Sequence, residues 1–423
     1  MSKPLIGFAG MTHLGLVSSI VAAQKGFNLV CYDPDSKIIE ELTVGNLQVS
    51  EPQLKDLLYS NKEYIFFTSD ASMLEKCDLV YVAPDVMTND AGKSDLSHIN
   101  SLLNIVFDAT RGDATIVVLS QVPPGFTRSR QRPGRALFYQ VETLIFGRAV
   151  DRALFPERYI VGCADPSCAL PKHYENFLRA YKCPLLLMRY ESAELAKISI
   201  NMFLVSTIST TNTIAELCEK IGADWAEIAP ALKLDKRIGP HAYLKPGLGV
   251  SGGNLERDLA TFCNLANEQN TDAGVVNSWL ANSRHRKTWA ANILRTILNN
   301  YNHCSIIAVW GLAYKENTHS TKNSPSIAAI SALNDFHVRA YDPIVSWRES
   351  WHPSTQFCST PMDALDNADA LMIMTPWPEF LSISPSAIAE RMKGRLILDP
   401  YGLLDEKLAR SAGLEIYTIG RFH

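Results

Sequence analysis

Apolar positions at the start of the chain alternate between short runs and a helical stripe. Residues 4–10 form an apolar run that ends in glycine, and residues 13–26 carry apolar side chains at helical spacing. Residues 27–35 follow as a second apolar run, with Asp33 at its end. This order predicts strand, glycine turn, helix and strand, the opening unit of a doubly wound sheet.

Further runs rich in valine and isoleucine predict more strands at residues 78–84, 114–121 and 158–162. Strands of this kind are buried on both faces, as in a parallel sheet that helices cover. We therefore expect an N-terminal α/β domain over residues 1–190.

The pattern changes to a long helix after about residue 191. Residues 192–222 carry an apolar stripe with small and β-branched side chains, which permit close packing against another helix. We interpret residues 191–300 as a central helical region and expect the long helix to lie at a dimer interface.

Strand candidates then return, separated by helices, at residues 304–314, 337–343, 370–376 and 395–400. They predict a second α/β domain over residues 301–423. The predicted fold class is α/β, with two Rossmann-like doubly wound domains joined by a long-helix central region.

Composition narrows the choice of partner. The 423 residues exceed what one hydrophobic core supports. Lys and Arg total 40 against 44 acidic residues, so no polybasic field favours nucleic acid or an anionic membrane. No apolar run approaches the roughly 18 residues of a membrane span. The expected partner is a small molecule.

Nine cysteines are scattered along the chain without a CxxC pair. This distribution is typical of reduced thiols, whereas disulfide frameworks belong to small secreted domains. The apolar start lacks a small-residue cleavage site and is interpreted as strand and helix rather than a signal peptide. We expect a cytoplasmic protein, and no metal site is predicted.

Residues 10–15 have the spacing of a dinucleotide-binding turn. Gly10 fits the tight turn and Gly15 the close packing of helix on strand, but Thr12 stands where a second glycine lets the backbone approach a pyrophosphate. Asp33 ends the next strand, where a carboxylate bonds the ribose 2′-hydroxyl of NAD and rejects NADP. The hexamer alone also fits an ordinary glycine turn, whereas with Asp33 it predicts an NAD site.

Other polar positions are less specific. Lys197 and Asn201 share one face of the long helix, and they fit a paired polar site as well as a lysine that extends to solvent. His13 and His241 are interpreted as structural or solvated, and Cys263 as an apolar filler.

Taken together, these stretches resemble the UDP-glucose/GDP-mannose dehydrogenase family nearly end to end. The most specific agreement is GLAYKENTHSTKNSPS at residues 311–326, which is similar to the family's GLAFKxNTDDxRxSP segment. Further agreements occur in the family's order at residues 82–97, 122–125, 193–203, 235–239, 368–380 and 419–421. The resemblance implies an NAD domain, a helical spine and a nucleotide-sugar domain. Together they oxidise a sugar C6 alcohol to a carboxylate through a cysteine thioester.

The resemblance also implies roles for single residues. Lys197 and Asn201 match a pair that stabilises charge on the reacting C6 oxygen, and Glu142 matches a carboxylate that acts through water in acid–base chemistry. Asp258 matches the aspartate that closes the catalytic loop. Arg237 matches an arginine that reaches into the neighbouring subunit's substrate site, which implies a homodimer.

Several binding residues follow in the same way. Lys315 matches a lysine near the substrate, and Lys322 stands where the family has an arginine close to the cofactor. Gln121 replaces the threonine of the family's STVPPG segment and is also expected to lie at the cofactor. Glycines of the loop at residues 246–258 are expected to let the backbone lie close to the sugar. They are Gly247, Gly249, Gly252 and Gly253.

This sequence departs from the family pattern at the nucleophile. Aligned from Pro246, the family's PGxGFGGSCFPKD places its cysteine at Asn254, and a shift by one residue places it at Leu255. A carboxamide cannot form the hemithioacetal and thioester that the second oxidation needs. Residues 143–147 (TLIFG) also replace FLREG, and residues 399–402 (DPYG) replace D-G-R-N.

Three functions stay open. The first is an NAD-dependent oxidoreductase limited to one reversible hydride transfer on a UDP-, GDP- or other NDP-hexose. Lys197 would stabilise the alkoxide, while Asn201 and Asn254 orient the oxygen. Glu142 or a water on Asp258 would accept the proton. The second is a redox-neutral epimerase with retained NAD. The third is a non-catalytic nucleotide-sugar-binding paralogue, in line with the number of substituted site residues.

Overall fold

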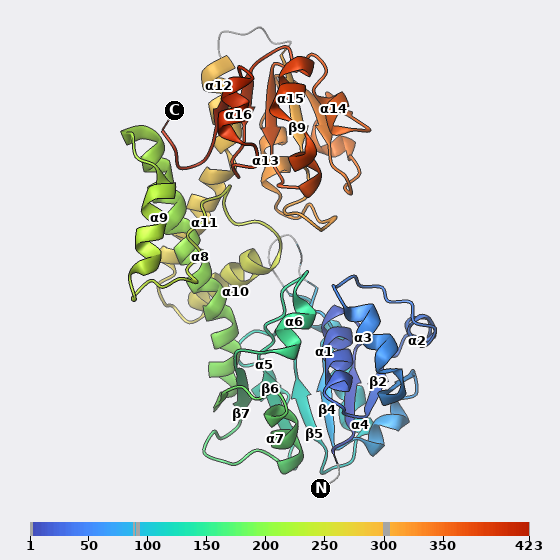
Figure 1. Ribbon diagram of the computed structural model, residues 1–423. Helices are drawn as coiled ribbons and strands as arrows, with labels where there is room; N and C mark the ends of the chain where they lie inside the picture. Colours follow the sequence, from blue (N-terminus) through green and yellow to red (C-terminus); the bar gives the residue numbers. More distant parts are fainter. Residues whose placement is uncertain (1–2, 88, 90–93, 299–304, 423) are drawn as a thin grey trace. The chain divides into compact units, whose positions relative to one another are not determined.

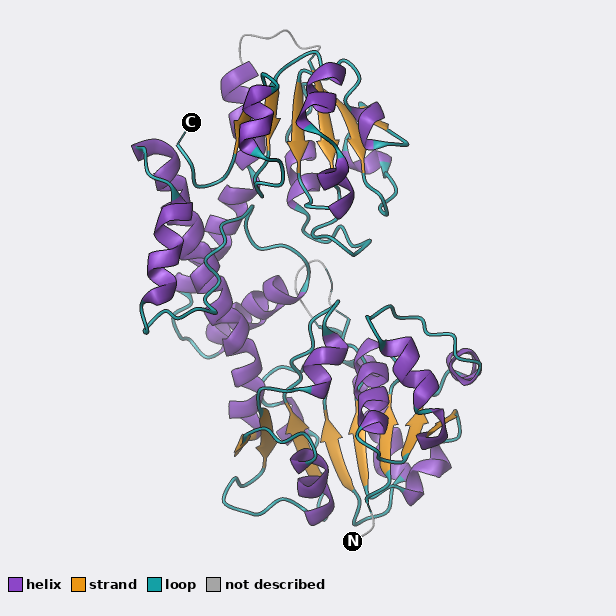
Figure 2. Ribbon diagram, in the orientation of Figure 1, coloured by secondary structure: helices purple, strands orange, loops and turns teal. Residues whose placement is uncertain are grey.

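The computed structural model describes residues 3–87, 89, 94–298 and 305–422 (Figures 1 and 2). The chain divides into two compact units, residues 1–200 and 201–423, and each is described by itself. The division into three domains stays a prediction, and its boundary at residue 300 lies outside the described residues. Among those residues, no helix is long and apolar enough to cross a membrane.

The first unit is built on one sheet, with the strand order β3-β2-β1-β4-β5-β6-β7-β8 in its described residues. The strands are β1 (Ile6–Ala9), β2 (Leu29–Tyr32), β3 (Ile65–Thr68), β4 (Leu79–Val82), β5 (Thr115–Val118), β6 (Ala136–Gln140), β7 (Tyr159–Cys163) and β8 (Leu185–Arg189). The helices are α1 (His13–Gln24), α2 (Ser36–Thr43), α3 (Leu54–Ser60), α4 (Ser97–Ala109), α5 (Phe126–Ser129), α6 (Ala149–Leu154) and α7 (Lys172–Arg179). Two short 3₁₀ turns complete it, η1 (Lys62–Tyr64) and η2 (Ala71–Lys76).

Helices cover both faces of this sheet, as the Val-rich strands predicted. Side chains of α1, α6 and α7 form one core with the sheet, and side chains of α4 form the other. β1, β2, β4 and β5 are buried throughout, because each lies inside the sheet with a helical layer on either side.

The expectation of a wholly parallel sheet is wrong at β7. This strand pairs antiparallel with β6, with Tyr139 opposite Gly162. The helix between the two strands, α6, has 6 residues and is about 9 Å long, too short to return the chain along a neighbouring strand. The chain therefore enters β7 from the end at which it left β6.

The sequence also missed the edge strands β3 and β8, and β6. Edge strands leave some side chains in solvent, and Phe66 in β3 is 50% exposed. Without a continuous buried run, such segments lack the pattern by which the central strands were found.

The second unit contains a parallel sheet with the order β11-β10-β9-β12-β13-β14 in its described residues. Its strands are β9 (Ile306–Trp310), β10 (His337–Tyr341), β11 (Thr355–Phe357), β12 (Ala370–Ile373), β13 (Leu396–Leu398) and β14 (Glu415–Tyr417). Helices associated with this sheet are α12 (Trp289–Leu298), α13 (Pro325–Ser331), α14 (Pro361–Ala364), α15 (Pro385–Arg391) and α16 (Glu406–Ser411), with 3₁₀ turns η3 (Glu349–Trp351) and η4 (Pro378–Ser382). All four predicted strands are present, and the short β11 and β14 were missed.

The predicted long helix is α8 (Tyr190–Ile221), which has 32 residues and continues from the first unit into the second. α9 (Trp225–Leu234), α10 (Asn254–Glu268) and α11 (Gly274–Lys287) follow it in the second unit. A small apolar cluster joins Val205 of α8 to Leu259 of α10 and Val276 of α11. The glycine-rich loop at residues 246–253 leads directly into α10.

Candidate active site

The turn between β1 and α1 fits a bound dinucleotide. Gly10 has a φ of +96°, and a Cβ there would lie 2.8 Å from the nitrogen of Pro84. A Cβ on Gly15 would lie 1.8 Å from the carbonyl oxygen of Gly10. Both glycines are therefore required by close approach of the backbone. The first N–H groups of α1 are available at this end to bind an anion, as in other dinucleotide sites.

Thr12, the residue that departs from the fingerprint, has a structural partner. Its hydroxyl oxygen accepts a hydrogen bond from the backbone N–H of Asp85, at 2.8 Å. The threonine thereby ties the turn to the segment that follows β4, an interaction that a glycine does not provide.

Asp33 lies at the end of β2, as predicted, and is 3% exposed. One carboxylate oxygen accepts from the N–H of Met11 at 2.7 Å, and the other from the N–H of Asp35 at 3.0 Å. Asp33 therefore holds the glycine turn against the end of β2. Its contact with a ribose hydroxyl stays a prediction.

The prolines of the VPPG segment precede a loop fastened to α8 by Glu194. The Glu194 carboxylate accepts from the N–H of Gly125 at 2.6 Å and from the N–H of Thr127 at 2.8 Å. Burial raises the pKa of Glu194, and the bonds from these groups oppose the rise. The sequence analysis did not identify Glu194 as a site residue. It could have been found as a carboxylate within the apolar stripe of the long helix, three residues before Lys197. Gln121 is half-buried at the start of the same loop.

Lys197 pairs with Glu142 in the first unit. The ammonium nitrogen lies 2.8 Å from the Glu142 carbonyl oxygen and 3.2 Å from its carboxylate Oε2. The two side chains are 13% and 17% exposed. The carboxylate also accepts from the N–H of Leu144. Lys197 is therefore held by Glu142 and does not extend into solvent, and its role in a paired site with Asn201 stays a prediction.

A second pair of predicted site residues lies in the second unit. The Asn201 amide nitrogen donates to Oδ2 of Asp258 at 2.5 Å, and Arg257 Nε lies 3.1 Å from the other oxygen. Asp258 is fully buried. Lys197 and Asn201 are one turn apart on α8, but each has its own carboxylate partner. Asn254 is exposed at the first position of α10.

Gly249 and Gly252 of the loop serve close packing inside the second unit. A Cβ on Gly249 would lie 2.5 Å from the carbonyl oxygen of Ser283, and a Cβ on Gly252 would lie 2.9 Å from the Tyr314 ring. The N–H of Gly252 donates to the carbonyl oxygen of Lys322, at 3.1 Å. The Gly247 N–H likewise donates within the protein, to Asn212. These two N–H groups therefore bond within the protein, and the close approach of the loop backbone to a sugar stays a prediction.

The segment at residues 311–326 lies against this loop. A Cβ on Gly253 would lie 3.3 Å from Cδ of Lys322, so the lysine stem covers the residue before Asn254. Asn323 donates to the carbonyl oxygen of Gly252 at 3.1 Å. Lys315 is half-buried, with its ammonium 5.7 Å from the centre of the Tyr314 ring. Substrate and cofactor contacts of both lysines stay predictions.

Arg237 is a predicted site residue at the surface of the second unit. Its side chain is 90% exposed and its guanidinium bonds Asp235, with Nη2 2.6 Å from Oδ2. This pairing lowers the pKa of Asp235. The arginine is thus presented at the surface, and its reach into a neighbouring subunit stays a prediction.

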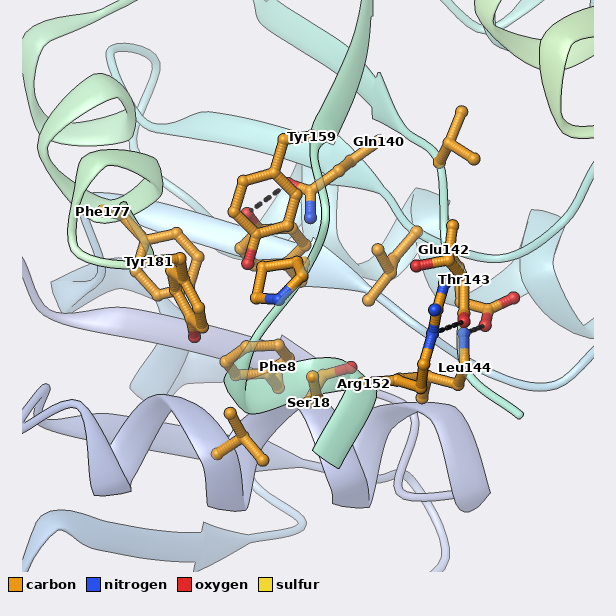
Figure 3. Close-up of a pocket in the computed structure, with 16 residues that line it drawn as sticks. Phe8, Ser18, Gln140, Glu142, Thr143, Leu144, Arg152, Tyr159, Phe177 and Tyr181 are labelled. Carbon is orange, nitrogen blue, oxygen red and sulfur yellow. Dashed lines mark hydrogen bonds between the residues drawn. The ribbon is translucent and has the colours of Figure 1, made fainter. Parts of the chain in front are cut away.

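A cavity of about 60 Å³ lies behind Glu142, bounded by the sheet, α1, the segment around α6, and α7 (Figure 3). Aromatic side chains such as Phe8, Tyr159 and Phe177 line it. The Gln140 oxygen accepts from the hydroxyl groups of Tyr81 and Tyr174. The volume suits a few water molecules. Within the described part of the chain, no cluster of three or more His, Cys, Asp or Glu side chains forms a metal site.

Comparison with known proteins agrees with this architecture. Residues 5–181 match the NAD binding domain of the UDP-glucose/GDP-mannose dehydrogenase family, residues 191–284 its central domain, and residues 308–406 its UDP binding domain. The UDP-glucose 6-dehydrogenase of Rickettsia conorii is 28% identical over 434 residues, which cover 98% of this chain and 99% of that protein.

Solved structures show the same fold. A UDP-D-ManNAc dehydrogenase from Pyrococcus horikoshii has a TM-score of 0.82 and 25% identity, covering 99% of both chains. A UDP-glucose dehydrogenase from Pyrobaculum islandicum has a TM-score of 0.83 and 24% identity, covering 100% of this chain and 98% of that one. The chain therefore belongs to the UDP-glucose/GDP-mannose dehydrogenase family of nucleotide-sugar dehydrogenases, whose cofactor is NAD.

Proposed function

We propose that the protein transfers a single hydride, reversibly, between an NDP-hexose and NAD, without a thioester step. The observation that carries the proposal is Asn254. This residue begins α10 and matches the family cysteine when the loop is aligned without a gap, while a shift by one residue gives Leu255, which also lacks a thiol. The match of residues 308–406 to a UDP binding domain supports a nucleotide sugar as the substrate.

We do not expect a neighbouring thiol to replace the missing nucleophile. The nearest in sequence is Cys263 of α10, about 13 Å along the helix axis from Asn254. Burial raises the pKa of Cys263, which disfavours the thiolate that attack on an aldehyde requires. Oxidation is therefore expected to stop at the carbonyl.

The remaining site residues support one redox step. Bound NAD supplies the hydride acceptor. Lys197 presents an ammonium group that stabilises an alkoxide as hydride leaves, and Glu142, bonded to it, provides a carboxylate for proton transfer. Asn201 and Asp258 form a second donor and acceptor pair that orients the substrate oxygen or a water. Neither pair contains the nucleophile that a second oxidation needs.

A second candidate is a redox-neutral epimerase that retains NAD. Formation of a carbonyl acidifies the adjacent C–H, and the Glu142 carboxylate is a base that can remove that proton. The non-catalytic alternative has less support, because both carboxylate pairs and the glycine turn are present.

The test is to incubate purified protein with NAD⁺ and UDP-glucose, GDP-mannose or a UDP-N-acetylhexosamine. The sugar products are identified by mass spectrometry after reduction with borodeuteride. The proposal expects at most one NADH per sugar and an aldehyde or ketone trapped as a deuterated alcohol. Two NADH per sugar with a uronic acid product would refute it.

Two other outcomes would favour the alternatives. Deuterium from D₂O at a ring carbon, without net NADH, would assign the epimerase. Binding of the sugar nucleotide without exchange of label between NADH and sugar would assign the non-catalytic role.

We also propose a homodimer in which Arg237 reaches the partner's substrate site. The molar mass in solution tests the dimer, and an Arg237→Ala variant tests the contact.

A further inference from the structure

Glu51 is a buried carboxylate outside the predicted site residues. Its side chain is fully buried, and its oxygens accept three hydrogen bonds. Oε1 lies 2.9 Å from His13 Nε2 and 2.9 Å from the N–H of Gly147, and Oε2 lies 3.1 Å from the N–H of Ala149. A carboxylate without access to water depends on such donors, because burial alone disfavours its charge.

These donors come from two separate parts of the first unit. His13 is the first residue of α1 and belongs to the dinucleotide-binding turn. Gly147 and Ala149 belong to the connection between β6 and β7, in which Glu142 is the second residue after β6. The same connection touches the turn directly, because the Phe146 ring stacks on the His13 ring with centroids 4.2 Å apart.

We propose that Glu51 and His13 are positioning residues that couple the dinucleotide-binding turn to the loop bearing Glu142. Neither is assigned a contact with the reacting atoms. Glu51 accepts a hydrogen bond from the His13 ring and so fixes the orientation of the ring. It also accepts from the backbone N–H groups of Gly147 and Ala149 and so holds the loop in place. An anion on the N–H groups of α1 therefore restrains the loop through His13 and Glu51, and an ordered loop favours the turn conformation that binds the anion.

One departure from the family pattern lies at this link. Phe146 occupies the place of the carboxylate in the family's FLREG segment. The phenyl ring, which is 55% exposed, packs on the imidazole that Glu51 holds. The change from Glu to Phe and the buried His13–Glu51 contact are thus mutually compatible.

The experiment compares wild type with Glu51→Gln and His13→Phe. The first replaces the carboxylate by an amide, and the second keeps a ring against Phe146 but removes the donor to Glu51. Affinity for NAD⁺ is measured by calorimetry, and hydrogen exchange of residues 143–149 is followed with and without NAD⁺. Glu63→Gln, at an exposed carboxylate, is the matched control.

In wild type and in Glu63→Gln, NAD⁺ is expected to slow exchange at the amides of Gly147 and Ala149. In Glu51→Gln the NAD⁺ dissociation constant should rise about ten-fold and the protection should disappear, since bonds to a charged acceptor are lost. Unchanged affinity, or full protection of the loop by NAD⁺ in folded Glu51→Gln, overturns the proposal. If Glu51→Gln does not fold, His13→Phe decides by the same two readouts, because it retains both backbone bonds to Glu51. A purely structural role would lower thermal stability without removing NAD⁺-dependent protection.

Discussion

The ammonium nitrogen of Lys197 lies 2.8 Å from the carbonyl oxygen of Glu142 and 3.2 Å from its carboxylate. Both groups are largely buried, so the lysine charge is held in place and lies beside a potential proton acceptor. Under the proposed function, a substrate oxygen that enters this position would take over part of the hydrogen bonding of the ammonium. In the proposed reaction, this ion pair would stabilise a developing negative charge.

Lys197→Ala tests this arrangement. We expect NADH formation from the sugar nucleotide to fall about 100-fold or more, because a preorganised donor to the alkoxide is lost. NAD⁺ binding, measured by calorimetry, should stay within about two-fold of wild type, since Lys197 is not part of the dinucleotide turn. Lys172→Ala, at an exposed lysine, is the control. An equal loss in both variants would argue against a specific role.

Asn254→Cys tests whether the residue that begins α10 limits the reaction. A thiol at the first position of a helix has a lowered pKa and is a nucleophile for an aldehyde. We expect the variant to form a covalent adduct with the sugar carbonyl, visible as a mass increase of the intact protein, and to release some uronic acid. Wild type and Asn254→Ser should show neither product. If Asn254→Cys forms no adduct while it still makes the carbonyl product, the alignment of this position with the family cysteine is incorrect.

Glu194 and Glu191 give opposite pH dependences on the same helix. Burial raises the pKa of Glu194 in the folded protein, so the free energy of unfolding falls as pH rises from the ordinary glutamate pKa to the raised value. The hydrogen bond from Arg128 lowers the pKa of Glu191 in the folded protein. The ionised Glu191 therefore stabilises the fold above the ordinary glutamate pKa, and this stabilisation is lost as pH falls.

The measurement is the melting temperature of Glu194→Gln and Glu191→Gln relative to wild type, between pH 4 and pH 7. As pH rises, the melting temperature of Glu194→Gln should increase relative to that of wild type. Over the same range, the melting temperature of Glu191→Gln should decrease relative to that of wild type. Parallel curves for the two variants would contradict the assignment of causes.

Gly249→Ala tests the packing of the glycine-rich loop. Gly249 has a φ of +86°, and an added Cβ would lie 2.5 Å from the carbonyl oxygen of Ser283. We expect a loss of about 1–3 kcal/mol in the free energy of unfolding from steric strain. Gly247→Ala is the control, because no atom lies within 4 Å of its added Cβ. Thermal and urea unfolding compare the two, and equal melting temperatures would rule out the close contact.

The sequence by itself determined the order and type of the main elements. The predicted helix at residues 192–222 is α8 (Tyr190–Ile221), and Asp33 directly follows β2, because helical and strand periodicities are local properties of the chain. It also shows that Asn254 and Leu255, the two positions that match the family cysteine, both lack a thiol, since a comparison of residue types needs no coordinates.

Only the tertiary structure decided which groups meet. The antiparallel pairing of β7, the separate carboxylates of Lys197 and Asn201, and the buried bond from His13 to Glu51 each join residues far apart in the sequence. Local periodicity gives the face of a helix or strand on which a side chain lies, but not the loop that packs against it. Burial increases the energetic importance of these polar contacts, because a charge removed from water is stabilised only by the partners that the fold brings to it.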